Sequence, residues 1–179
     1  MLPITLPEAR MFNEQTETFI QVPAVTLKLE HSLISIAKWE SKWQKSYLSS
    51  NGLTSEEFMD YIRCMSLDPN IDRETLLRLT KNDLAIIIAY IKAPMTATTF
   101  SKLSNEPRNH DIITAEIVYY WMVSFGIPFE CEKWHINRLL TLIEVCSRKQ
   151  NPQKMSNMEA ARMRYAMNEA RKKKFGTKG

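Results

Sequence analysis

The chain has 179 residues, of which 44% are hydrophobic and 25% charged, and it contains four glycines and three cysteines. A chain of this length can bury a stable core without disulfide or metal cross-links. An odd number of cysteines without a CxxC pair disfavours a disulfide framework or a zinc ribbon. Charge is uneven, because residues 154–179 carry a formal charge of +6 while residues 1–153 sum to −2. No run of about 18 apolar residues and no secretory signal is present, so we expect a cytosolic chain that does not enter a membrane.

Residues 1–31 are predicted to form a β element. Val25, Leu27 and Leu29 alternate with polar residues, the period of a strand with one buried face. Upstream, Met11–Phe12 and residues 18–21 flank a polar stretch that is typical of a hairpin loop. Two or three short antiparallel strands are therefore expected, and these must pack on helices or pair with another chain.

Residues 32–94 are predicted to form four helices, because apolar residues recur there at spacings of three and four. Each helix has a capping residue in front of it, and these are Ser32, Thr54 or Ser55, Asp72 and Thr80. Pro69 and Pro94 are expected to end the second and fourth helices. Leu84, Ile87, Ile88 and Ile91 are expected to point inward from the fourth.

Residues 95–113 are less regular and favour a strand or hairpin with an exposed loop. Thr114 is then expected to cap a helix over 115–125 that is apolar on most sides, which predicts deep burial. Gly126 suits the position after that helix. A further helix is expected from Pro128 to Ser147, followed by a linker over 148–154.

The last helix is predicted to begin at a capping box of Ser156 and Glu159 and to end at Gly176. The sequence therefore predicts a mainly α (α+β) fold, a helical bundle of about six to seven helices with a small N-terminal antiparallel β element and a basic C-terminal helix. We divide it into the β element at 1–31, a helical body at 32–147, and a linker with the basic helix at 148–179.

Candidate catalytic and metal residues are few. Cys131 and His135 are expected four apart on one helix, a spacing that suits two metal ligands, but zinc needs three or four and no second pair is recognisable. Cys131 or Cys146 with His135 could form a nucleophile and base, yet no glycine-rich oxyanion loop accompanies them. His31 and His110 look isolated. We expect ordinary packing, no enzyme activity, no metal and no cofactor.

Trp39 and Trp43 are expected on one side of a helix, either in the core or at a groove or subunit contact. The C-terminal helix has a seam of Met and Ala among cations. It could dock on the body, on a partner protein, on nucleic acid or on an anionic membrane, and Met and Ala are weak residues for membrane insertion. The candidate partner-binding residues are Arg162, Met163, Arg164, Met167, Arg171, Lys172, Lys173 and Lys174.

Three segments resemble a family of small tailed-bacteriophage proteins from the tail gene module, often described as tail assembly chaperones or tail-associated proteins. They read LKLEHSLISIAKW at Leu27–Trp39, IPFECEKWHINRLLTLIEV at Ile127–Val145 and NEARKKKFGTKG at Asn168–Gly179. The resemblance implies a non-enzymatic chaperone in the host cytoplasm that holds the tape-measure protein and recruits tail-tube subunits.

Two alternatives remain open. One is a structural virion protein of the tail or head–tail junction, and the other is a nucleic-acid-binding module that uses Arg162–Lys174. A homo-oligomer is compatible with each of these functions.

Overall fold

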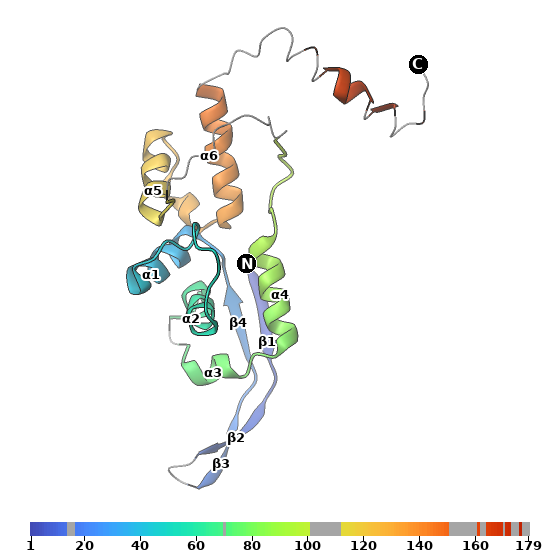
Figure 1. The fold of residues 1–179 in the computed structure, drawn as a ribbon. Coiled ribbons are helices and arrows are strands. Elements are labelled where there is room, and N and C mark those ends of the chain that lie inside the picture. Colours follow the sequence, from blue (N-terminus) through green and yellow to red (C-terminus); the bar gives the residue numbers. More distant parts are fainter. Residues whose placement is uncertain are drawn as a thin grey trace. The chain divides into compact units, whose positions relative to one another are not determined.

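The computed structural model describes residues 1–13, 17–69, 71–100 and 112–150, and further along residues 161, 164–169, 171, 172 and 176. The chain separates into two compact units, Met1–Glu144 and Val145–Gly179, and each is described by itself. The fold is mainly helical with antiparallel strands at the N-terminus (Figure 1), so the predicted α+β class is confirmed.

Four short strands form the β element, rather than the two or three expected. β1 (Leu2–Leu6) pairs with β4 (Val25–Leu29), and β2 (Ala9–Asn13) pairs with β3 (Thr18–Val22), both antiparallel. Pro7 and Pro23 lie between the two ribbons, where a residue without a backbone N–H interrupts the ladder. Buried side chains line one face of the first ribbon and are Ile4, Leu6, Leu27 and Leu29, which confirms the predicted alternation around the last two.

Four helices follow, as predicted, and they are α1 (Leu33–Trp43), α2 (Ser55–Met65), α3 (Arg73–Leu77) and α4 (Lys81–Lys92). The predicted caps are confirmed, because the side chains of Ser32, Thr54, Asp72 and Thr80 each accept a backbone N–H from the first turn. In this unit α1 packs against α2 and α5, and α4 packs against β1.

Two details of these helices differ from the prediction. α2 ends at Met65, well before Pro69, because the chain there turns to pair with β4: Glu30 N–H donates to Met65 O at 2.8 Å, and Leu67 N–H donates to Lys28 O at 2.9 Å. In α4 the buried stripe runs through Ile87 and Tyr90, whereas Ile88, expected to point inward, is 38% exposed.

The region after α4 corrects two further predictions. No strand occurs in Met95–Phe100 or at residues 112–113, and residues 101–111 lie outside the described part. α5 (Ala115–Ser124) forms where expected, but the prediction of deep burial is wrong, since Tyr120 is 67% and Val123 64% exposed. Gly126 follows the helix with φ +64°, which confirms its predicted place.

The helix predicted from Pro128 to Ser147 is two helices. A 3₁₀ helix η1 (Phe129–Lys133) and α6 (Ile136–Gln150) are separated at Trp134, whose backbone is extended. The break has a physical cause, because the N–H of Ile136 donates to the carbonyl of His31 at 2.7 Å. α6 also continues through residues 148–150, which were expected to belong to the linker.

The second unit holds the end of α6 and, among its described residues, helical turns at 161, 164–169 and 171–172. Gly176 has φ +62°, as suits a residue that ends a helix. The predicted capping box of Ser156 and Glu159 lies outside the described residues.

Candidate functional site

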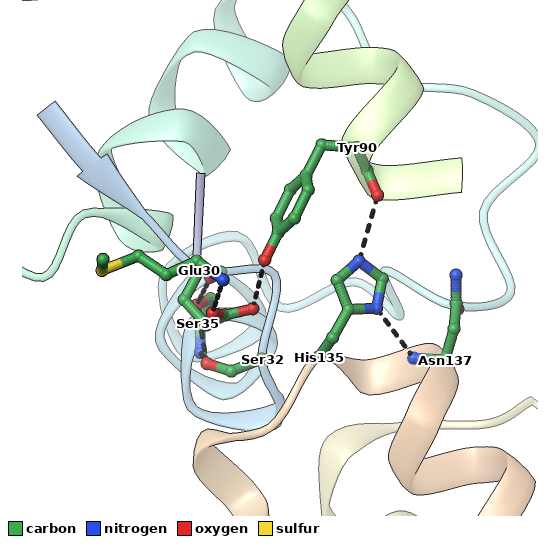
Figure 2. Close-up of polar contacts among 7 residues, drawn as sticks. Glu30, Ser32, Ser35, Tyr90, His135 and Asn137 are labelled. Atoms are coloured by element: carbon green, nitrogen blue, oxygen red, sulfur yellow. Dashed lines mark hydrogen bonds and ion pairs between the residues drawn. The ribbon is translucent and has the colours of Figure 1, made fainter. Parts of the chain in front are cut away.

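A buried polar cluster connects the end of β4 with α2, α4 and the start of α6. Figure 2 shows the part of it that holds Glu30, Tyr90 and His135. At its centre the imidazoles of His31 and His135 meet edge to face, with ring centroids 5.0 Å apart. His31 Nδ1 shares a short hydrogen bond with the Tyr61 hydroxyl. The two histidines are only 3% and 6% exposed, so this cluster belongs to the interior.

Glu30 forms the other end of the cluster. Its Oε1 accepts the hydroxyl of Tyr90 at 2.6 Å, and its Oε2 lies 2.5 Å from the amino group of Met1. The backbone carbonyl of Glu30 accepts the Ser35 hydroxyl at 2.7 Å, as Figure 2 shows. One residue therefore ties β4 to α1 and α4.

The hydrogen bonds of His135 define its tautomer. The backbone N–H of Asn137 donates to His135 Nδ1 at 3.3 Å, so this nitrogen carries no proton. His135 Nε2 then carries the proton and donates to the carbonyl of Tyr90 at 3.0 Å. The Asn137 side chain donates to the carbonyls of Ala93 at 2.8 Å and Ile91 at 3.2 Å, which fixes the end of α4 against α6.

Burial sets the charge state of the cluster. It lowers the pKa of His31 to about 3, with the neighbouring His135 as the second cause, and burial also lowers the pKa of His135. Burial raises the pKa of Tyr61 well above its usual value. All three side chains are therefore neutral near pH 7, and they act as a hydrogen-bonded clamp between elements.

Sequence reasoning missed this cluster, since it treated His31 as isolated. It also placed Cys131 and His135 on one helix, which is wrong: Cys131 lies in η1 and His135 directly precedes α6. Cys131 is buried and Cys146 half-buried, both as free thiols. Within the described ranges no group of three or more His, Cys, Asp or Glu side chains is arranged to hold a metal ion.

A buried carboxylate, that of Glu40, lies near the end of α1. Glu40 Oε1 accepts the N–H of Tyr47, and Oε2 accepts the N–H of Ala115, both at 2.7 Å. Thr114, the residue predicted to cap α5, makes no side-chain capping bond. Burial raises the pKa of Glu40. The cap of α5 is therefore supplied from α1, which sequence reasoning could not see.

The two tryptophans of α1 lie on one side of the helix, as predicted, and their rings stack with centroids 6.1 Å apart and an angle of 25° between the planes. Trp39 is fully buried and its Nε1–H donates to the carbonyl of Glu57 at 2.9 Å. Trp43 is half-buried and its Nε1–H donates to Asp60 Oδ2 at 2.9 Å. Trp39 is thus a core residue, while Trp43 is bonded to Asp60, which lines a pocket.

That pocket has a volume of about 490 Å³ and lies between α1, α2 and α3. Its apolar lining comes from Met59, Leu76 and Leu77, and its charged lining from Lys42, Glu56, Asp60, Arg63 and Arg73. We call it the α1–α2–α3 pocket. The meeting of these residues was not predicted from the sequence.

The candidate partner-binding residues of the C-terminal helix are described only in part. Arg164, Met167, Arg171 and Lys172 are helical and exposed. Arg162, Met163, Lys173 and Lys174 lie outside the described residues, as does His110. Tyr165, which sequence reasoning did not single out, is 70% exposed beside Met167 at 53%.

Comparisons with family models, with curated proteins and with solved structures found no match to this chain. None of the described helices combines the length and the apolar character needed to cross a bilayer.

Proposed function

We propose that this protein is a non-enzymatic bacteriophage tail morphogenesis protein, a tail assembly chaperone that binds the tape-measure and tail-tube proteins. The observation that carries the proposal is the exposed helix in the second unit. Tyr165 and Met167 are 70% and 53% exposed there, next to the exposed cations Arg164, Arg171 and Lys172. Apolar and cationic side chains together suit a protein partner, and methionine adapts to varied surfaces.

The first unit offers further support. Tyr120 and Val123 lie on α5 with about two thirds of their surface exposed, and Phe129 on η1 is 56% exposed. Two of the candidate chemical residues of the sequence analysis, His135 and Cys131, are instead buried, as is His31. Exposed apolar side chains of this kind support a surface that binds a partner protein.

The test is co-expression of the tagged protein with the tape-measure and tail-tube proteins of the same phage. We expect both to co-purify with the wild-type chain and to be lost from a variant with Arg164→Glu, Met167→Ser, Arg171→Glu and Lys172→Glu. A variant with Lys28→Glu, Lys81→Glu and Lys92→Glu changes three exposed cations of the first unit and serves as the charge control. If neither partner co-purifies with the wild-type chain, the proposal is wrong.

A structural virion protein is the second candidate, and the β2–β3 ribbon favours it. Four of the five residues of β3 are exposed, among them Phe19 at 73% and Ile20 at 47%. A two-stranded ribbon of this kind is marginal in water and gains stability when an assembly covers it. Mass spectrometry of purified virions separates the two: presence in stoichiometric amounts supports the structural role, and absence supports the chaperone.

A further inference from the structure

The α1–α2–α3 pocket has a size and a lining that suit a ligand. Its volume of about 490 Å³ falls within the range of roughly 300–1,000 Å³ that is usual for binding pockets. Ser55, Met59 and Arg63 line it from α2 at a spacing of four residues, which places them along one face of that helix. The pocket therefore follows about two turns of α2, with α3 as its other wall.

The apolar lining includes a side chain that the fold itself does not need to cover. Leu76 and Leu77 are neighbours in α3, but Leu76 is 3% exposed and Leu77 is 67% exposed. Leu76 belongs to the core, whereas Leu77 presents its surface to solvent at the pocket. Met59 lies opposite on α2, and its flexible thioether can adjust to an incoming apolar group.

The charged lining has an excess of positive charge. Asp60 receives Lys42 Nζ at 2.6 Å and Arg63 Nη2 at 3.1 Å, in addition to Trp43 Nε1. Burial raises the pKa of Asp60, but the hydrogen bonds from Lys42 and Trp43 outweigh this effect. The pKa is therefore lowered overall, and the carboxylate is ionised. One carboxylate thus balances only one of its two cations.

Arg73 adds to this excess, because it makes no ion pair with any residue in the described part of the chain. The lining as a whole has three cations against the two carboxylates Glu56 and Asp60. This net positive site lies on a body whose residues 1–153 sum to −2. Charge complementarity therefore favours an anionic ligand at this place on the surface.

We propose that the α1–α2–α3 pocket binds a helical segment of a partner protein in which leucine-like side chains lie next to Asp or Glu. The apolar side chains would contact Leu77 and Met59, and the carboxylates would pair with Arg73 and Arg63. A groove along one helix face is suited to a second helix laid into it. The inference deepens the proposed function, on which it rests for the partner being a protein.

The test uses a fluorescein-labelled helical peptide with Leu and Glu on one face and Ala elsewhere, followed by fluorescence anisotropy with the full-length protein. The same peptide with Lys in place of Glu tests the charge. We expect the acidic peptide to bind and the lysine peptide to bind at least about ten-fold more weakly, which is a modest free-energy difference. The indole of Trp43 gives a second signal, since it is bonded to Asp60 in the pocket wall.

Two leucines provide a matched pair of variants. Leu77→Asp places a charge at the pocket, while Leu67→Asp changes a leucine that is 57% exposed and does not line it. Exposed substitutions of this kind have little effect on folding, which circular dichroism would check. We expect Leu77→Asp to lower the affinity for the acidic peptide by about ten-fold or more, and Leu67→Asp to leave that affinity unchanged. Arg73→Glu should lower the affinity for the acidic peptide as well.

Equal binding of the two peptides, or an unchanged affinity in Leu77→Asp, would overturn the inference. Its failure is distinguishable from failure of the proposed function. If tail proteins co-purify equally with Leu77→Asp and wild type, the chaperone proposal holds and the pocket is not its site. If the acidic peptide binds through Leu77 but no tail protein co-purifies, the pocket inference holds and the chaperone proposal fails.

Discussion

The carboxylate of Glu40, near the end of α1, accepts the backbone N–H of Ala115, the first residue of α5, at 2.7 Å. Its other oxygen accepts the N–H of Tyr47 at the same distance. A single buried side chain therefore caps one helix and orders the loop after another. Because Glu40 is only 8% exposed, water cannot easily replace either bond.

Removal of this carboxylate should destabilise the first unit. Glu40→Ala leaves two backbone N–H groups without their acceptor, and we expect a loss of about 3 kcal/mol in the free energy of unfolding. Thr114→Ala should cost under about 0.5 kcal/mol, since Thr114 makes no capping bond. Urea unfolding of the two variants measures both values. A larger loss for Thr114→Ala than for Glu40→Ala would contradict the assignment of the cap.

Mild acid should weaken the fold through His31. The pKa of His31 is about 3 in the folded state against an ordinary value of 6.5. Between these two pH values the imidazole is protonated in the unfolded chain but not in the folded one. Stability is therefore unaffected by this group above pH 6.5 and falls as the pH decreases toward 3. Between pH 7 and pH 5 we expect a loss of about 2 kcal/mol from His31 alone.

The variant His31→Gln isolates this effect. Glu40, whose pKa is raised, has the opposite influence, because it gives the folded state the higher proton affinity. Both wild type and variant share Glu40, so the difference between their pH profiles reports His31. Urea midpoints at pH 7 and pH 5 provide the measurement. Parallel profiles would show that His31 is not the group responsible.

Arg78 should hold the two β ribbons in a fixed arrangement. Its Nη2 donates to the carbonyls of Pro7 and Pro23, the latter at 3.2 Å, and these residues lie between the ribbons. Arg78→Met keeps an unbranched stem and removes the donors, and we expect a loss of about 1 kcal/mol. Hydrogen exchange at the amides of Gln21 and Val22 should become faster. Unchanged exchange at both amides would argue against such a role for Arg78.

Local features of this fold were predictable from the sequence. Ser32, Thr54, Asp72 and Thr80 were predicted as helix caps, because a cap acts on an N–H only a few residues away. The class of fold follows from the same local patterns. The break at Trp134 was not predictable, since it depends on a bond from Ile136 to the distant His31.

The interior clusters and the pocket could not be predicted for a similar reason. His31 and His135 are far apart in the sequence, and neither position has a local signal that it faces the other. Lys42, Met59 and Leu77 come from three different helices and meet only after these helices have packed. The exposure of Tyr120 was also not predicted. A helix that is apolar on most sides indicates burial, but the pattern does not show which of its faces the rest of the chain covers.

We propose that the protein acts by binding tail proteins during assembly. The most direct measurement is electron microscopy of particles from a phage in which this gene is deleted, with the wild-type gene supplied from a plasmid as the control. We predict filled heads without tails in the deletion, and normal tails when the wild-type gene is supplied. Normal tails in the deletion, at the frequency of the parent phage, would show that the protein is not needed for tail assembly.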